Sequence, residues 1–513
     1  MSSILVEYNS NTQTLQAEPG QLLLDVLRQN GLSVSAPCGG NGTCGKCRVT
    51  LVTDQNSTQI LACQTRVEND CRIRLKLSSN GVICTHTQTN LSFTPLLRNG
   101  FGAAIDLGTT TIAIRLFDLS TANQVAQISD WNIQRSYGGD VITRCQYCME
   151  HDNGLEVLSH LIRQQILQLL TQMCAEKNIP FRNITEICLS GNTVMQHLVT
   201  QNSPISIALA PFTPKLFFDR PFTDHLGNAD VFYSPCVSGY VGGDITAGLL
   251  ACGLDQKEEI SLFLDIGTNG EMALYSHGRF VCCAVASGPA FEGAGITCGM
   301  SSTQGAVCHV QWTPNGPEYE VIGGGTPKGL CGSGLLDLLA VLLKLGAVDE
   351  SGYLLPPEDA PSFFSQWLGE DEDGNGIFYL TSDKSIFFTA RDVRQLQLAK
   401  AAVAAGISVL MEHTGLSFSD LNTLYLAGGF GCHMSAQSAV AIGMLPEALQ
   451  AKIRCVGNSS LSGTSTVLLD PAKRKNLLDI QKKCQYLELS GNTSFNYYFP
   501  EHMTFDKEES PWK

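Results

Sequence analysis

Short apolar runs that end in glycine-rich polar turns recur along this chain of 513 residues. The run 260–264 leads into the turn 265–271, and another apolar run follows it. Two apolar runs joined by a tight turn of glycine, threonine and asparagine predict a β-hairpin. The same order occurs earlier, where 102–105 leads into the turn 106–111 and a further apolar run. We interpret the two hairpins as an internal duplication.

The two turns carry groups that suit a phosphate and a divalent cation. Their glycines let backbone N–H groups approach an anion closely, and their hydroxyl and amide side chains add donors. Asp265 at the strand end suits a hydrated Mg²⁺, and Asp106 is its counterpart in the first copy. The other turn residues are Gly108, Thr109 and Thr110 in the first copy and Gly267, Thr268, Asn269 and Gly270 in the second. Because Asp-x-Gly-Thr is short and such turns are common, a purely structural role for both hairpins is the alternative.

A third apolar strand ends in a pair of glycines. Residues 424–427 lead into Gly428 and Gly429, and Phe430 follows. Backbone without side chains can lie flat against a planar ligand such as adenine. Two Asp-x-Gly-Thr turns followed by Ala-Gly-Gly resemble the acetate and sugar kinase, heat-shock chaperone and actin superfamily, over about residues 101–490. The resemblance implies two ribonuclease-H-like halves that close over ATP, with the turns on the phosphates and the glycine pair against the adenosine.

Three further stretches belong to the predicted nucleotide unit. Gly332 and Ser333 open a predicted helix, where free N–H groups and the helix dipole favour a phosphate. Asp244 precedes a helix of small residues at 245–252 that fits the interdomain helix of the superfamily, so it is a candidate to orient water or Mg²⁺. Glu292 lies in the stretch Gly-Pro-Ala-Phe-Glu-Gly. The predicted catalytic residues are therefore Asp106, Asp265, Asp244 and Glu292.

The N-terminal region carries cysteines with the spacing C-x5-C-x2-C-x15-C. Cys38, Cys44 and Cys47 share a glycine-rich loop, and Cys63 follows on a separate segment. Three thiolates with loop N–H groups and a fourth thiolate from elsewhere suit a cluster of iron and sulfide. Zinc is the competing interpretation, although zinc ribbons usually show two C-x2-C pairs and this stretch has one. Cys71 is an alternative fourth ligand.

The pattern around these cysteines predicts a small β-rich domain. The expected elements are a hairpin at 4–8 and 13–16, an amphipathic helix at 21–30, and strands at 49–52 and 72–76. This β-grasp layout resembles [2Fe-2S] ferredoxins, although the first gap between cysteines has five residues where the plant type has four. The resemblance implies a [2Fe-2S] cluster on the four cysteines. Polar runs after this domain show no helical or strand period and indicate a linker.

Other periodic segments predict the remaining elements of the large unit. They are helices at 154–174 and 390–410, strands at 184–189, 421–426 and 453–456, and a helix at 194–198 capped by Thr193. His197 in that helix is predicted to pack structurally rather than to act as a base. Cys331 lacks an evident base partner in the sequence, so we predict that it also packs.

Composition and charge exclude several classes of protein. The hydrophobic share of 43% supplies ample core, and the length suggests about three domains. The net charge of −15 argues against nucleic acid or an anionic membrane as a partner. No secretory pattern begins the sequence, and the longest apolar segment, 335–348, contains Asp337 and Lys344. We therefore expect a cytoplasmic protein whose 20 cysteines are reduced thiols or metal ligands.

The predicted fold is an α+β β-grasp [2Fe-2S] ferredoxin domain followed by duplicated α/β ribonuclease-H-like domains of the actin-like ATPase type. The predicted limits are 1–80 for the ferredoxin-like domain, 81–100 for the linker, 101–255 for the first half, 256–490 for the second half with the nucleotide site, and 491–513 for a tail.

The combination of the two units resembles the reductive activators of corrinoid proteins. That resemblance implies ATP and Mg²⁺ as ligands, and ATP-driven transfer of an electron from the [2Fe-2S] cluster to the Co(II) corrinoid, a cobalamin-type cofactor, of a methyltransferase system. The alternatives are an ATP-dependent activator of another low-potential enzyme, a redox-sensing nucleotide-binding module, and a small-molecule kinase with an appended ferredoxin. The sequence does not identify the low-potential electron donor or the corrinoid protein, and it does not decide whether the chain forms a homodimer.

Overall fold

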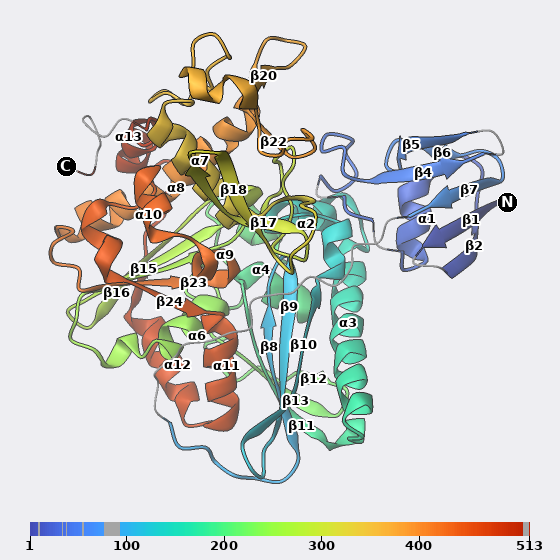
Figure 1. The fold of residues 1–513 in the computed structure, drawn as a ribbon. Coiled ribbons are helices and arrows are strands. Elements are labelled where there is room, and N and C mark those ends of the chain that lie inside the picture. The colour runs from blue at the N-terminus through green and yellow to red at the C-terminus, as the bar shows by residue number, and fades with distance from the viewer. Residues whose placement is uncertain are drawn as a thin grey trace.

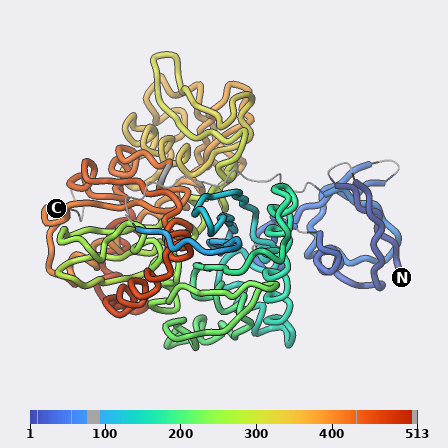
Figure 2. Tube along the Cα trace, turned by 90° about the horizontal axis from the view of Figure 1, so that it is seen from below, coloured from blue at the N-terminus to red at the C-terminus, as the bar shows by residue number. Residues whose placement is uncertain are grey.

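The structure, a computed structural model, describes most of the chain. The described residues are 1–8, 11–32, 34–36, 38–53, 56–75, 93–505 and 512. Figure 1 shows a small N-terminal domain beside a larger body, and the view from below in Figure 2 agrees that this domain projects from one side. Most of the predicted linker lies outside the described residues. The limits predicted for the domains stay predictions.

A five-stranded sheet and one helix form the N-terminal domain. Its elements are β1 (Ser2–Tyr8), β2 (Asn11–Ala17), β3 (Gln21–Leu22), α1 (Leu23–Gln29), β4 (Arg48–Val52), β5 (Ser57–Leu61), β6 (Arg66–Val67) and β7 (Cys71–Arg74). In the strand order β2-β1-β7-β4-β5, β1 runs antiparallel to β2 and parallel to β7. The apolar side of α1 is buried in a core formed by residues between Ile4 and Leu75. This architecture confirms the predicted β-grasp fold.

The N-terminal domain differs from the sequence prediction at two elements. The predicted helix at 21–30 begins at Leu23, because the two residues before it form β3 and pair with β6. Strand β5 was not predicted, since its first residues are polar and exposed and show no apolar alternation. The predicted strand at 72–76 is β7, and Lys76 lies outside the described residues.

The first half of the body is a six-stranded sheet with helices packed on it. Its strands are β8 (Phe101–Leu107), β9 (Thr111–Asp118), β10 (Asn123–Trp131), β11 (Ile184–Gly191), β12 (His225–Leu226) and β13 (Ala229–Tyr233). Its helices are η1 (Ile133–Ser136), α2 (Val141–Glu150), α3 (Gly154–Glu176), η2 (Phe181–Asn183), α4 (Thr193–Val199) and α5 (Ile205–Ala208). The predicted long helix at 154–174 is α3. The strand order is β10-β9-β8-β11-β13-β12.

The second half repeats this arrangement. Its strands are β14 (Ser261–Ile266), β15 (Gly270–Ser276), β16 (Arg279–Val285), β23 (Thr423–Ala427), β24 (Ile453–Gly457) and β25 (Cys484–Tyr486), in the order β24-β23-β14-β15-β16-β25. In each sheet the first three strands form an antiparallel meander, and the first strand pairs in parallel with a later one, β11 with β8 and β23 with β14. The duplicated fold is confirmed.

Two helices join the halves. They are α6 (Gly243–Ala251), followed by η3 (Leu254–Gln256), and α11 (Ser459–Leu469). They approach so closely that a Cβ added to Gly463 would lie 1.9 Å from the carbonyl oxygen of Ala247. Residues of both helices and of both sheets share one hydrophobic cluster, which includes Leu249, Leu461 and Phe263. The strand ends of the two halves are therefore held in a fixed relation by backbone contact.

The remaining elements extend the second half. The strands are β17 (Ala306–Thr313), β18 (Gly316–Val321), β19 (Gly329–Leu330), β20 (Leu368–Glu370), β21 (Gly376–Tyr379) and β22 (Phe387–Thr389). The helices are η4 (Pro289–Glu292), α7 (Gly332–Leu345), η5 (Ser362–Trp367), α8 (Ala390–Thr414), α9 (Gly428–His433), α10 (Ala436–Ala441), η6 (Glu447–Lys452), α12 (Lys473–Lys483) and α13 (Thr493–Glu501). The stretch predicted as a tail contains α13, whose aromatic residues Phe495, Tyr498 and Phe499 pack against the core. Among the described residues, no helix is both long and apolar enough to cross a membrane.

Candidate functional site

The four predicted cluster cysteines lie together as two pairs of thiols. The Sγ atoms of Cys38 and Cys44 are 3.2 Å apart, and those of Cys47 and Cys63 are also 3.2 Å apart. Within the described ranges, no three His, Cys, Asp or Glu side chains surround one point as they would for a single metal ion. Two thiol pairs suit two irons better than one tetrahedral zinc. Cys71 stands on β7, outside both pairs.

The loop around these thiols is built for backbone approach. Gly39, Gly40, Gly42 and Gly45 all have positive φ angles between 62° and 111°, which glycine adopts without strain. Burial raises the pKa of the Cys38 thiol, but hydrogen bonds from the Cys44 backbone and thiol and from neighbouring backbone N–H groups outweigh it and bring the pKa to about 6. The loop therefore stabilises a thiolate, the form that binds iron.

The two Asp-x-Gly-Thr turns meet at one carboxylate. The Thr268 hydroxyl donates to Oε1 of Glu292 at 3.0 Å, and the Thr110 hydroxyl donates to Oε2 at 3.2 Å. Each turn comes from a different half of the body, so Glu292 bridges the halves. The structure thus brings together turns that the sequence places far apart.

Several partly exposed carboxylates surround these turns. Burial is the main cause that raises the pKa of Asp265, to about 7, and the nearby Asp106 raises it further. Burial also raises the pKa of Asp244 to about 8, with Asp106 and Asp265 adding to the effect. Glu271, opposite Asp265 on β15, has its pKa raised by burial and by both Asp244 and Asp265. Each of these carboxylates, when ionised, disfavours ionisation of its neighbours.

Asp106 is held by two residues from the other half. Its Oδ1 accepts a hydrogen bond from the Ser460 hydroxyl, and its Oδ2 accepts one from the Asn458 amide, both at 2.7 Å. Burial nevertheless raises its pKa overall. Asn458 caps α11 and Ser460 lies in its first turn, so α11 orients the first turn's aspartate.

The glycine pair lies against the second turn. Gly428 has a φ of +82°, and a Cβ added there would lie 2.5 Å from Oδ1 of Asp265. Gly429 follows it at the start of α9. Phe430 is buried and stacks on Phe291, with ring centroids 4.7 Å apart. Contact of this segment with an adenosine stays a prediction.

The predicted phosphate site at Gly332 and Ser333 is enclosed by the protein. A Cβ added to Gly332 would lie 1.8 Å from the carbonyl oxygen of Phe291, and the Ser333 hydroxyl donates to the Cys308 carbonyl at 2.8 Å. The two residues do begin α7, as predicted. A phosphate contact at this helix stays a prediction.

Predictions for His197 and Cys331 are confirmed, whereas the predicted cap at Thr193 is wrong. His197 is fully buried, and its two ring nitrogens contact the Thr193 carbonyl and the Leu216 N–H. The buried Cys331 thiol donates to the Val307 carbonyl. Asn192 caps α4 by accepting from the Met195 N–H, and it precedes Thr193, which is the first helical residue.

Sequence reasoning missed several residues that shape the site. Glu271 could have been found, because it belongs to the second turn motif. The others reach the turns from separate elements and gave no local signal; they are Asn132, Arg144, Asn192, Asn458 and Ser460.

Comparisons with known proteins agree with this geometry. A family model described as a 2Fe-2S iron-sulfur cluster binding domain matches residues 6–68, one described as the RACo middle region matches 101–257, and one described as the C-terminal domain of RACo, the ASKHA domain, matches 259–513. A solved structure titled reductive activator for corrinoid, iron-sulfur protein matches with a TM-score of 0.74 and 29% identity, and covers 100% of both chains. The chain belongs to the family of reductive activators of corrinoid proteins.

Two curated relatives share most of this activator's length. The corrinoid activation enzyme RamQ of Eubacterium limosum is 28% identical, and the match covers 92% of this chain and 94% of RamQ. The [Co(II) methylated amine-specific corrinoid protein] reductase of Methanosarcina barkeri is 24% identical over 78% of this chain and 76% of its own. Both matches extend well beyond the ferredoxin-like domain and include the nucleotide unit.

Proposed function

We propose that this activator uses ATP to drive one electron from a [2Fe-2S] cluster to the Co(II) corrinoid of a methyltransferase-system protein, which restores Co(I). The observation that carries the proposal is the bridge by Glu292 between two Asp-x-Gly-Thr turns, in a chain that also pairs four cysteine thiols. The relatives' names, corrinoid activation enzyme and Co(II) corrinoid protein reductase, support the same substrate.

In this proposal each ligand has defined residues. Cys38, Cys44, Cys47 and Cys63 hold the cluster, which supplies a one-electron donor when bound. The two turns bind the ATP phosphates through their N–H and hydroxyl groups, and Gly428, Gly429 and Phe430 bound the adenosine side. Asp265 with Asp106 or Asp244 holds Mg²⁺, since Mg²⁺ usually takes only one or two carboxylates together with phosphate oxygens and water. In this proposal Glu292 and Asp244 orient a water for hydrolysis.

ATP is needed because an uphill electron transfer is costly. Each 59 mV of unfavourable potential lowers the equilibrium constant tenfold, which is about 1.4 kcal/mol for one electron. Coupling between two sites usually supplies about 1–3 kcal/mol, less than a gap of several hundred millivolts requires. Binding of ATP to the two turns, followed by hydrolysis, supplies the difference.

The remaining expectations concern partners and location. The corrinoid protein and a low-potential electron donor are the macromolecular partners, and the net charge of −15 disfavours nucleic acid and anionic membrane. We expect a cytoplasmic protein. A homodimer is compatible with the proposal and is not required by it.

The test is anaerobic visible spectroscopy of a purified Co(II) corrinoid protein mixed with the activator, a chemical reductant and Mg²⁺-ATP. We expect the Co(I) absorption band to grow only when ATP is present. Equal growth without nucleotide would contradict the coupling. No growth, with the cluster fully reduced, would point to another low-potential acceptor.

Two cysteine variants test the assignment of the cluster ligands, and one of them is the control. Cys63→Ser removes one member of a thiol pair, so we expect loss of the cluster's visible absorption and of cobalt reduction, with ATP binding retained. Cys71→Ser changes a thiol outside both pairs. We expect it to keep the cluster and the activity, and loss of the cluster in this variant would show that the fourth ligand was assigned wrongly.

A further inference from the structure

The first nucleotide turn is held from behind by polar side chains. Asn132 donates from its side-chain amide to the Gly108 carbonyl at 2.9 Å and from its backbone N–H to the Thr110 carbonyl at 2.9 Å. Arg144 donates to the carbonyl between them, that of Thr109, at 2.5 Å. Each of the three consecutive carbonyls of the turn thus accepts a hydrogen bond from Asn132 or Arg144. Their N–H groups are the ones left to face an anion.

Arg144 is an unusual choice for this task, because it is a fully buried guanidinium. Its other hydrogen bonds go to neutral acceptors, which are the Gly138 carbonyl at 3.1 Å, the Gln134 side-chain oxygen at 3.2 Å and the Met195 sulfur at 2.9 Å. Among the described residues, no carboxylate forms an ion pair with it. Burial accordingly lowers its pKa. The negative charge of Asp140 opposes this effect only in part, and a buried guanidinium without a paired carboxylate is costly.

Asn132 and Gln134 also define the short helix η1. The side-chain oxygen of Asn132 accepts from the Gln134 N–H at 3.0 Å and caps the helix. Gln134 is buried and donates to the Leu158 carbonyl at 2.8 Å. The segment η1 is therefore rigidly attached to the nucleotide turn at one end. Its other end is the carbonyl of Ser136.

That carbonyl is bound by the ferredoxin-like domain. Arg28, at the end of α1, donates from Nε to the Ser136 carbonyl at 2.9 Å and also from Nη2. The same Nη2 donates to the carbonyl of Gly39, next to Cys38, at 3.0 Å. The guanidinium lies 4.7 Å from the centroid of the Tyr137 ring, a cation–π contact. One side chain therefore contacts both the cluster loop and η1.

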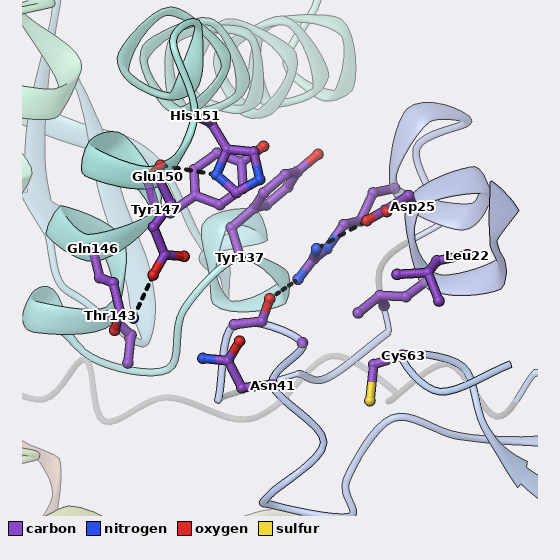
Figure 3. A pocket seen from close by; sticks show the side chains of 14 residues that line it. Leu22, Asp25, Asn41, Cys63, Tyr137, Thr143, Gln146, Tyr147, Glu150 and His151 are labelled. Atoms are coloured by element: carbon purple, nitrogen blue, oxygen red, sulfur yellow. Dashed lines mark hydrogen bonds and ion pairs between the residues drawn. The ribbon is translucent and has the colours of Figure 1, made fainter. Parts of the chain in front are cut away.

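Arg28 lines a cavity of about 170 Å³, and Figure 3 shows the side chains around this cavity. Leu22, Asp25, Asn41 and Cys63 line it from the ferredoxin-like domain, whereas Tyr137, Thr143, Gln146, Tyr147, Glu150 and His151 line it from the body. The body contributes three aromatic rings, since Tyr147 stacks on His151 with ring centroids 4.1 Å apart and contacts Tyr137 edge to face with centroids 5.1 Å apart. The contact between the two domains thus encloses a cavity, but it buries the Arg28 side chain, which is only 7% exposed.

We infer that these contacts form a relay that couples occupation of the nucleotide turn to docking of the cluster domain, with Arg144 and Arg28 as its positioning residues. The relay runs from the Thr109 carbonyl through Arg144 and Gln134 to η1, and from the Ser136 carbonyl through Arg28 to the cluster loop. It gives the cluster domain a defined position while nucleotide is bound. The inference rests on the proposed function only in requiring that the turn binds ATP.

The sign of the coupling follows from the geometry. Docking of Arg28 fixes η1, and η1 fixes the side chains that donate hydrogen bonds to the three carbonyls of the turn. Docking therefore favours the turn conformation that binds nucleotide, and nucleotide favours docking. By thermodynamic linkage, docking raises the affinity for nucleotide by the same factor by which nucleotide raises the equilibrium constant for docking.

The test measures nucleotide affinity in the full-length, cluster-loaded protein by anaerobic titration calorimetry with Mg²⁺ and a non-hydrolysable ATP analogue. Two variants interrupt the relay from opposite sides. Arg28→Ala changes the ferredoxin-like domain. Tyr137→Leu changes the body and leaves the sequence of the ferredoxin-like domain unaltered. We expect each to weaken binding at least about fivefold, the low end of ordinary coupling between sites. The double variant should weaken it no further than the stronger single variant, because both remove one interaction.

The matched control is Arg48→Ala. Arg48 also donates to a carbonyl of the cluster loop, that of Gly45 at 3.1 Å, but it is exposed, and within the described part of the chain no hydrogen bond joins it to η1. We expect its nucleotide affinity to equal that of the wild type. Hydrogen exchange supplies a second measurement, which a purely local loss of stability would not affect. In the wild type and in Arg48→Ala, the ATP analogue should slow amide exchange in α1 and the cluster loop. In Arg28→Ala, the analogue should leave this exchange unchanged.

Four outcomes would overturn the relay. They are unchanged affinity in both variants, a loss in only one of them, an equal loss in Arg48→Ala, and additive losses in the double variant. A wild type that binds no nucleotide would refute the proposed function as well. Because no corrinoid protein enters the experiment, a relay that fails in a nucleotide-binding wild type says nothing against the proposed function.

Discussion

At the scale of single residues, the proposed nucleotide site gathers carboxyl groups that repel one another when ionised. Burial and neighbouring carboxylates raise the pKa of Asp265 to about 7 and that of Asp244 to about 8. The native protein therefore holds protons that the unfolded chain releases from about pH 4 upward. For such groups the free energy of unfolding falls as pH rises from the unfolded pKa to the folded pKa, so the nucleotide-free protein loses stability between about pH 4 and 8.

Asp244→Asn tests this argument. The amide keeps an oxygen that can accept from the Ile245 N–H, as Oδ1 of Asp244 does at 2.9 Å, but it carries no charge. We expect the melting temperature of the nucleotide-free protein to rise by about 2–4 °C at pH 8, the shift that about 1 kcal/mol produces in a large domain. At pH 5 we expect little change, because Asp244 is already protonated. Thermal denaturation at both pH values measures the difference.

The same variant should lose function as it gains stability. ATP hydrolysis is expected to fall by about 10²-fold or more if Asp244 takes part in proton transfer or Mg²⁺ binding. Asp219→Asn, an exposed aspartate in a loop of the first half, is the matched control and should alter neither the melting temperature nor hydrolysis. An equal gain of Asp244→Asn at pH 5 and pH 8 would refute the electrostatic explanation.

At the scale of elements, local pattern predicted the parts of the site that lie within one hairpin. Strands β8 and β14 are nearly continuous apolar runs because both of their faces are covered, and the glycine turns after them mark where the chain reverses. Helices α3 and α8 were found from their apolar period. Each of these patterns involves residues close together in the sequence, so it can be recognised without knowledge of the fold.

Contacts between elements had no such signal. Asn458 and Ser460 reach Asp106 only because α11 packs across β8 from the other half, and Arg144 reaches the first turn only because α2 follows η1 back toward it. Polar residues at a helix start predict a cap, and Asn458 is one, but its side-chain amide is also used across the domain boundary. Tertiary packing decides these partners, and a single sequence does not reveal it.

The contact between α6 and α11 fixes the positions of Asp244, which α6 carries, and of Asp106, which Ser460 of α11 holds. Gly463→Ala would place a Cβ 1.9 Å from the Ala247 carbonyl oxygen, so the helices must separate. We expect a loss of about 1–3 kcal/mol in the free energy of unfolding, the usual cost of overpacking. ATP hydrolysis should fall as well, because α6 carries Asp244 and α11 carries Ser460. Chemical denaturation and a hydrolysis assay measure the two effects.

Gly431→Ala provides the comparison for that prediction. Its added Cβ would lie 3.5 Å from the nearest atom, an ordinary van der Waals distance, and its φ is not positive. The free energy of unfolding should therefore change little. If Gly463→Ala were equally well tolerated, the close approach of the two helices would not be what fixes the halves.

At the scale of the whole molecule, the cluster domain and the body have separate cores. The core of the first lies between Ile4 and Leu75, whereas the large cores of the body begin at Ala103. The two parts meet at a contact that leaves a cavity, with Arg28 on Ser136 and Tyr137 as its polar centre. Such a contact suits a domain that docks and separates, while a single chain keeps the two parts near each other.

Cutting the chain between them should therefore separate the two activities. We expect a fragment of residues 93–513 to fold and to bind nucleotide, more weakly than the full chain by the factor that Arg28→Ala produces, and to reduce no cobalt. Adding the cluster domain as a separate protein at about 10 µM should restore only about a hundredth of the rate, because a tether supplies an effective concentration in the millimolar range. The rate of Co(I) formation measures this, and it should rise in proportion to the added domain. Full activity at 10 µM would show that docking is tight without the tether, and it would contradict a domain that alternates between docked and free positions.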